Sequence, residues 1–258
     1  MTYTLRNGGA VAEIVPERGG LITRFAVNGD EVFYLDRATL DDITKNVRGG
    51  VPILFPCAGK PPAGWPMKQH GFARNFPFRC MGVDDSRLAM ELASTPATLE
   101  TFPFDFRLAL SVELETDSLA LRITVENTGL ERMPVHFGLH PYFALPLAAK
   151  AGTRIPTAAT RAFDNTTGAM VAYQTPDFGE GEIDLHLLDH GSHAATLGNR
   201  RIEWDAFLPV LVLWTQPEKP FLCVEPWSAL AGELAHPQRW LTPGASTGGV
   251  FRVTVSQT

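Results

Sequence analysis

The chain has 258 residues, of which 45% are hydrophobic and 19% are charged, and its formal net charge is −6. This balance allows a sizeable buried core and argues against global disorder. The acidic charge argues against a general nucleic-acid surface, which needs a basic stripe, although a few arginines can still form a local pocket for an anionic small molecule.

Alternating apolar and polar residues predict strands along most of the chain. Near the start, Asn28-Gly29 stands between two apolar runs and is a strong hairpin signal. "FRLALSVEL" (106–114) and "LRITVEN" (121–127) alternate with the period of two that is typical of half-buried strands, and "ETDS" between them predicts a hairpin turn. Residues 251–255 at the end of the chain repeat the alternation.

Two late segments are apolar almost without a break. They are "PVLVLWT" (209–215) and "FLCVEPW" (221–227), and they predict strands covered on both sides. Segments 57–69 and 146–180 are rich in Pro, Gly, Ala and Thr and predict long loops, where functional sites often lie. Because helical periodicity is scarce and no linker or repeat marks a boundary, we expect one all-β domain over residues 1–258, with two packed sheets.

The three cysteines, Cys57, Cys80 and Cys223, are far apart, and no CxxC motif occurs. This argues against a disulfide framework or a zinc ribbon and favours a reducing compartment. The N-terminal stretch "MTYTLRNGGAVAEIV" lacks the features of a signal peptide, and no run of about 18 apolar residues predicts a membrane span. We therefore expect a cytoplasmic protein without a membrane or nucleic-acid partner.

A histidine pair, His136 and His140, lies in "HFGLH". On a helix, this spacing would place both rings side by side, as in a metal-binding pair. Gly138, the preceding Pro134 and the following Pro141 favour extended chain instead, in which residues four apart stand roughly 13 Å from each other. One ion cannot bind both rings at that distance. The alternative for either histidine is a core or turn residue bonded to the backbone; His140, at the strand end, is the better placed for chemistry.

Glu225 stands inside the apolar run "FLCVEPWSA". A carboxylate in such surroundings is costly unless it is paired or hydrogen-bonded. Partial burial would raise its pKa and make it a better base than a free glutamate. The alternative is a structural ion pair with an arginine, and the residues alone leave both interpretations open.

Basic residues interrupt two glycine-containing apolar segments. Arg48 precedes two glycines, and His70 and Arg74 flank a Gly-Phe-Ala stretch. The glycines let the chain turn or approach a ligand closely, although no GxGxxG or P-loop pattern surrounds them. Solvated surface arginines are the alternative. Asp184 in "GEIDLHLL" is a weaker site candidate, with a surface strand as its alternative.

No activated nucleophile is evident. A GxSxG elbow is missing from the sequence, and Cys57 and Cys223 lie in apolar strings that are typical of inert core cysteines. The remaining histidines and Glu225 suit proton transfer without a covalent intermediate. A sugar is a reasonable ligand, since tryptophans offer flat apolar faces, although core packing is their more frequent use; the candidates are Trp65, Trp214 and Trp227.

Four segments, in this order, resemble the aldose 1-epimerase (galactose mutarotase) superfamily. They are "RGGVPILFP", "QHGFARNFPF", "HFGLHPYF" and "FLCVEPWSA", and the resemblance covers nearly the whole chain. Within this superfamily, the sequence is most similar to the bacterial mutarotase-like branch and the hexose-6-phosphate mutarotases. The resemblance implies a β-supersandwich of two large packed antiparallel sheets. It also implies reversible interconversion of the α and β anomers of an aldose, with no cofactor and no metal.

By motif position, the resemblance also implies roles for individual residues. Glu225 would be the general base at the C1 hydroxyl, and His140 the general acid at the ring oxygen O5, on the opposite side of the sugar ring. His70 would hydrogen-bond the ring oxygen or nearby hydroxyls, and Asp184 would hold sugar hydroxyls. In this interpretation Pro141 ends the strand that carries His140.

The same interpretation gives Gly138 the task of making room for the sugar. Arg48 and Arg74 match positions that contact the phosphate in hexose-6-phosphate mutarotases, so the expected partner is a small-molecule sugar or sugar phosphate. The alternatives are a non-catalytic carbohydrate-binding protein and a metal-dependent isomerase or hydrolase using His70, His140 and Glu225. The sequence leaves the identity of the sugar and the oligomeric state open.

Overall fold

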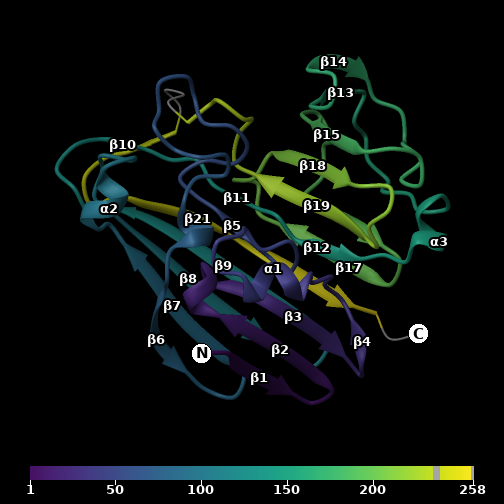
Figure 1. The fold of residues 1–258 in the computed structure, drawn as a ribbon, viewed down its shortest axis with the longest axis horizontal. Helices are drawn as coiled ribbons and strands as arrows, with labels where there is room; N and C mark the ends of the chain where they lie inside the picture. The colour runs from purple at the N-terminus through teal and green to yellow at the C-terminus, as the bar shows by residue number, and fades with distance from the viewer. Residues whose placement is uncertain (235–238, 257–258) are drawn as a thin grey trace.

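The computed structural model describes residues 1–234 and 239–256, and most of its regular structure is antiparallel sheet (Figure 1). The seven-stranded sheet contains, in spatial order, β16 (Ala194–Leu197), β17 (Arg200–Trp204), β21 (Ser246–Val255), β9 (Ser118–Asn127), β8 (Phe106–Leu114), β7 (Arg87–Ala93) and β6 (Arg79–Val83). The eight-stranded sheet contains β14 (Ala169–Ala172), β13 (Arg161–Asp164), β15 (Ile183–Leu187), β18 (Val210–Thr215), β19 (Phe221–Trp227), β11 (Gly138–Leu139) and β5 (Ile53–Leu54), and β12 (Tyr142–Ala144) also pairs with β19.

Smaller elements complete the described fold. A four-stranded sheet at the bottom of Figure 1 contains β1 (Tyr3–Asn7), β2 (Ala10–Val15), β3 (Leu21–Val27) and β4 (Asp30–Glu31), and a two-stranded ribbon pairs β10 (Met133–Pro134) with β20 (Trp240–Leu241). The helices are α1 (Arg37–Asp41), α2 (Pro96–Leu99) and α3 (Leu147–Lys150), with 3-10 turns η1 (Pro16–Arg18) and η2 (Ala73–Asn75). The prediction of an all-β chain with large antiparallel sheets is confirmed.

The alternating segments form the strands that their period predicts. In β8 the residues Phe106, Leu108, Leu110, Val112 and Leu114 are all buried, and the turn at 115–117 leads into β9. The hairpin between β3 and β4 is also confirmed. Its turn residues Asn28 and Gly29 have φ values of 52° and 90°, a left-handed conformation that asparagine and glycine accept more readily than other residues. One apolar cluster joins side chains from the three larger sheets.

The two unbroken apolar segments form β18 and β19, but their two faces differ. Leu211, Leu213, Leu222 and Val224 pack into the main core. The opposite face, which carries Glu225, is buried as well but lines a cavity. Burial of both faces therefore produced the continuous apolar pattern. One face packs into the main core, and the other forms two smaller apolar clusters and lines the cavity.

The loop predictions are correct for one segment and wrong for part of the other. Segment 57–69 contains no named helix or strand. Segment 146–180 contains α3 and the hairpin β13–β14, because β13 finds a partner in β15 through pairs such as Ala162 with Leu187. That partner lies outside the segment, so local composition did not reveal it. No helix within the described residues is long and apolar enough to cross a membrane.

Candidate active site

Strand register places the predicted acid–base residues in one row across the eight-stranded sheet. His186 pairs with Val212, and Val212 pairs with Glu225. On the other side of β19, Gly138 pairs with Trp227 and Tyr142 pairs with Cys223, so His140 lies opposite Glu225. Side chains opposite each other on neighbouring strands share a face of the sheet. The next row on this face contains Tyr142, Cys223, Trp214 and Asp184.

His140 and Pro141 lie between two short strands that follow one another in the chain. The short strands β11 and β12 lie on either side of Pro141, and both pair with β19. A proline has no N–H to donate to the ladder, so pairing lapses there and resumes at Tyr142. The N–H of His140 itself donates to the Pro52 carbonyl at 3.1 Å. The strand therefore ends before Pro141, as expected, and the chain resumes its pairing with β19 beyond it.

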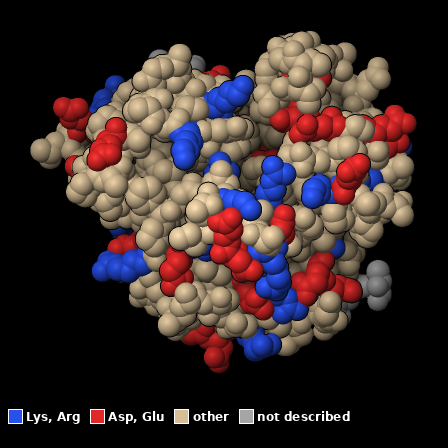
Figure 2. Space-filling view, in the orientation of Figure 1, with Lys and Arg blue, Asp and Glu red and all other residues tan. Residues whose placement is uncertain are grey.

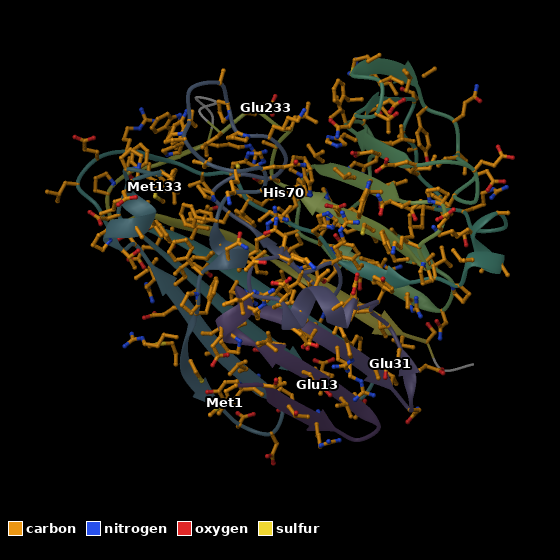
Figure 3. The ribbon with its side chains drawn as sticks, in the orientation of Figure 1. Met1, Glu13, Glu31, His70, Met133 and Glu233 are labelled. Atoms are coloured by element: carbon orange, nitrogen blue, oxygen red, sulfur yellow. The ribbon has the colours of Figure 1, made fainter. Side chains whose placement is uncertain are left out.

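Both rows face a cavity of about 380 Å³, which is at the small end of the range of roughly 300–1,000 Å³ typical of small-molecule sites. Figure 2 shows Lys and Arg side chains around a hollow in this face of the molecule, with Asp and Glu along one rim. His70 lies near the centre of the molecule, beside the strands of the eight-stranded sheet (Figure 3). All six residues predicted for the site line the cavity, namely Arg48, His70, Arg74, His140, Asp184 and Glu225.

His140 and Glu225 are in contact, with Nδ1 3.4 Å from Oε1. Glu225 is 1% exposed and His140 is 8% exposed. Burial raises the pKa of Glu225 well above its ordinary 4.5, and the charge of Asp184 raises it further. Burial also lowers the pKa of His140 from 6.5 to about 3, and the charge of Arg74 adds to that effect. Desolvation thus favours the neutral form of each group, and between the two pKa values the pair holds one proton.

This contact corrects the expectation that the two groups lie on opposite sides of a sugar ring. Opposite residues on paired strands have Cβ atoms only about 5 Å apart, so no ring fits between these two. A sugar would instead lie over both, because they project from the same face. Trp227 completes the pair, since its Nε1–H donates to Glu225 Oε2 at 3.2 Å.

His70 enters the cavity from the loop before η2, with a left-handed φ of 67°. The N–H of Gly59 donates to His70 Nδ1 at 3.0 Å. Nδ1 is therefore the acceptor, and the ring proton lies on Nε2. Gln69 Nε2 lies 3.3 Å from this atom, so the Gln69 amide has to turn its oxygen, an acceptor, toward the ring. Burial, and then the neighbouring His140, lower the pKa of His70 well below 6.5. A neutral ring with Nε2–H suits donation to a sugar oxygen.

The two predicted arginines line the cavity without carboxylate partners. Arg48 is exposed and donates from Nη1 to Gln216 Oε1 at 3.2 Å. Arg74 is half-buried and donates from Nη2 to the Gln69 carbonyl at 2.9 Å. Across residues 1–234 and 239–256, every ion pair of an arginine involves an arginine other than Arg48 and Arg74. Both guanidinium charges therefore remain available to a ligand.

Asp184 lies on β15 and is held by two donors. Asn165 Nδ2 donates to Oδ2 at 2.7 Å, and His186 Nε2 lies 3.1 Å from Oδ1. His186 was not among the predicted site residues, although "DLH" contains the signal. Residues two apart on a strand share a face, so a site at Asp184 also brings His186 into the site.

The remaining candidate residues divide between the core and the cavity wall. His136 is fully buried, with Nε2 3.1 Å from the Ala229 carbonyl, and burial lowers its pKa to about 4. The core interpretation therefore fits His136. Trp65 packs against Phe102 and Phe104, whereas Trp214 and Trp227 line the cavity.

Gly138 makes room for a side chain and not for a sugar. A Cβ at this position would stand 2.6 Å from Cδ1 of Trp227. The indole occupies the space that the sequence analysis assigned to ligand. The expectation for Gly138 is therefore wrong, because a large aromatic on the neighbouring strand fills the gap.

The metal-dependent alternative named His70, His140 and Glu225. Among the described residues, the one group of three or more such residues whose ligand atoms all lie within 4.8 Å of one another is His140, Cys223 and Glu225. Burial raises the pKa of the Cys223 thiol well above its ordinary 9.0, which disfavours the thiolate that a metal needs. His70, His140 and Glu225 all line the cavity, but their ligand atoms are not among those that approach within 4.8 Å as a group.

Comparisons with known proteins agree with the motif resemblance. A family model described as aldose 1-epimerase matches residues 1–250. The crystal structure of the Slr1438 protein from Synechocystis sp. PCC 6803 is 35% identical, with a TM-score of 0.93 over 100% of this chain and 96% of that one. A galactose mutarotase-like protein from Lactobacillus casei ATCC 334 has the same fold at 24% identity, with a TM-score of 0.80 over 99% and 100% of the chains. A Salmonella typhimurium LT2 protein, provisionally named glucose-6-phosphate 1-epimerase, is 40% identical over 86 residues, or 32% of this chain and 29% of that protein.

Proposed function

The chain belongs to the aldose 1-epimerase family, and from this premise we propose that it interconverts the α and β anomers of a hexose by acid–base ring opening and closure. The observation that carries the proposal is the buried contact between His140 and Glu225 on the floor of a sugar-sized cavity. Two groups that share one proton can supply both a base and an acid without a cofactor.

The proposed reaction begins when the Glu225 carboxylate takes the proton of the C1 hydroxyl. The C1–O5 bond breaks as the C1 carbonyl forms, and protonated His140 gives its proton to O5. Rotation about C1–C2 presents the other face of the carbonyl, and ring closure returns both protons with the roles reversed. The form in which Glu225 is ionised and His140 is protonated is one of the two arrangements of the shared proton.

The surrounding residues suit a sugar. His70 Nε2–H is a donor for the ring oxygen or a nearby hydroxyl, and Asp184 is an acceptor for hydroxyl protons. Trp214 and Trp227 offer apolar faces for the carbon skeleton. The non-catalytic alternative is less well supported, because a binding protein has no need of a desolvated acid–base pair.

Anomer exchange followed by NMR on a panel of free and 6-phosphorylated aldoses tests the proposal. Purified protein should accelerate exchange of at least one of them over buffer alone. Binding of a sugar without faster exchange would favour the non-catalytic alternative. The absence of both binding and exchange would refute the proposal.

The pH dependence of the exchange rate should show a broad plateau. Activity needs one proton on the pair: a second proton binds only near the lowered pKa of His140, about 3, and the shared proton leaves only above the raised pKa of Glu225. Groups with ordinary values would restrict the active form to pH 4.5–6.5. We therefore expect a flat kcat through neutral pH and a fall on each side. A maximum confined between 4.5 and 6.5, after subtraction of the buffer-catalysed rate, would contradict this protonation scheme.

A hexose-6-phosphate is the second candidate substrate, favoured by the free charges of Arg48 and Arg74. If the ligand carries a phosphate, loss of either guanidinium should cost about 1.5–3 kcal/mol, or roughly tenfold to hundredfold in kcat/KM. Lysine should rescue poorly because it lacks the planar fork. The measurement is kcat/KM for glucose 6-phosphate and glucose on Arg48→Ala, Arg74→Ala and both lysine variants.

The control is Arg79→Ala, on the edge strand β6, where the arginine is exposed and pairs with Glu91. It should leave both substrates unaffected. A loss limited to the phosphorylated sugar would support a sugar-phosphate enzyme. An equal loss on both sugars, or a wild-type preference for glucose, would leave a free aldose as the substrate.

A further inference from the structure

His186 is a buried side chain in the cavity wall to which the proposed reaction gives no task. It lies on β15 in the same row as Glu225, with Val212 between them. The residue is 2% exposed and still belongs to the cavity lining. Its ring lies near Phe163, and two further contacts, with Asp184 and Trp227, lead to two different parts of the site.

The first contact is with Asp184, two residues earlier on the same strand face. His186 Nε2 lies 3.1 Å from Asp184 Oδ1. A carboxylate accepts, so Nε2 carries the proton and donates. Asn165 donates to the other oxygen, and together the two donors fix the orientation of the carboxylate plane. Each oxygen keeps a further lone pair for a hydroxyl of the ligand.

The second contact is with Trp227. The ring centroids of His186 and Trp227 are 5.0 Å apart with an interplanar angle of 73°. The indole also meets the ring of His70, at 5.7 Å and 79°. Edge-to-face packing against two rings restricts how the indole can tilt. Its orientation matters because Nε1–H donates to Glu225.

We infer that His186 is a positioning residue that couples the carboxylate assigned to the sugar hydroxyls, Asp184, to the indole that holds the base, Trp227. The inference rests on the proposed function for its kinetic consequences, while the contacts themselves do not. The Nε2–H of His186 fixes Asp184, and the ring of His186 fixes Trp227. These two properties can be removed separately.

His186→Phe keeps a flat ring against Trp227 and removes the donor to Asp184. We expect KM to rise about tenfold, at the lower end of what a lost hydrogen bond to a charged group costs, because Asn165 still donates. The kcat value should change little. His186→Gln keeps an N–H at a similar reach and removes the ring. Here KM should stay near wild type, and kcat should fall about threefold to tenfold, as expected for one lost aromatic pair.

His190 provides the matched control. It is also buried, at 3% exposed, with Nε2 2.8 Å from the Pro209 carbonyl and its ring near Trp204, and it does not line the cavity. His190→Phe and His190→Gln should lower stability without a split between KM and kcat. The indole Nε1–H signal of Trp227, assigned with Trp227→Phe, should move in His186→Gln and stay in both His190 variants.

Three outcomes would overturn the inference: wild-type kinetics in both His186 variants, equal changes of KM and kcat in both, or an unmoved Trp227 signal in His186→Gln. If a His186 variant does not fold, Asp184→Asn provides the test from the other end. The Trp227 indole signal should then shift through His186, and an unshifted signal contradicts the coupling. If the wild type exchanges no anomers, the proposed function fails, and the NMR signals still decide whether the coupling exists.

Discussion

Glu225→Gln is expected to slow anomer exchange by about 10²–10⁴-fold, the range typical of a positioned acid–base group. The amide keeps the shape of the side chain and can still accept from Trp227 Nε1–H, but it cannot take a proton from the C1 hydroxyl. The measurement is the exchange rate by NMR, at equal concentrations of wild type and variant.

The same substitution should preserve the fold or stabilise it. Burial raises the pKa of Glu225, so the folded state retains a proton that the unfolded state has released above pH 4.5. Stability then falls as the pH rises through the folded-state pKa. An amide does not titrate and therefore does not lose stability as the pH rises. The melting temperature of Glu225→Gln at neutral pH should equal or exceed that of wild type.

Two controls accompany this variant. Glu91→Gln, on β7, changes a carboxylate whose ion-pair partner is the exposed Arg79, and it should leave exchange unchanged. Dialysis of the wild type against a chelator should also leave exchange unchanged. Near-wild-type exchange in folded Glu225→Gln would remove Glu225 from the mechanism, and loss of activity with the chelator would favour the metal-dependent alternative.

His140→Asn is expected to cost a similar factor, about 10²–10⁴, because no group then protonates O5. The pH dependence of its exchange rate should run in the opposite direction to that of the wild type at alkaline pH. With Glu225 as the remaining titrating group of the pair, the residual rate should rise as the pH passes the raised pKa of Glu225, where the wild-type rate falls. Exchange rates from pH 4 to 10 on both proteins would show this, after correction for buffer catalysis.

His136→Asn is the matched control, four residues earlier in the chain. Its ring is fully buried, and Nε2 contacts the Ala229 carbonyl and the Ala58 N–H. Loss of these contacts should lower the melting temperature and leave the exchange rate per folded molecule unchanged. A His140→Asn rate close to wild type, or a profile that keeps both limbs, would show that another group protonates the ring oxygen.

The local conformation of much of the chain was predictable, because a strand imposes a period of two on any sequence that buries one of its faces. β8 follows that period over its nine residues, and β9 and β21 follow it from Leu121 and Gly248 to their ends. The hairpin at Asn28-Gly29 was predictable for an equally local reason, its left-handed backbone. The short motifs around Arg48, His70, His140 and Glu225 were specific enough to identify the family.

The register between distant strands could not be predicted from the sequence. His140, Glu225, Val212 and His186 meet in one row although β12 and β15 lie about 40 residues apart in the chain, and that alignment depends on how whole sheets pack. The contact between His140 and Glu225, the coupling of Asp184 to Trp227 and the filling of the space at Gly138 all follow from that register. The opposite pKa shifts of the pair follow from burial at that place. The sequence alone determined the local strand pattern over most of the chain. Only the tertiary structure decided that β13 and β14 form and which side chains meet, because strand pairing, register and desolvation are non-local properties.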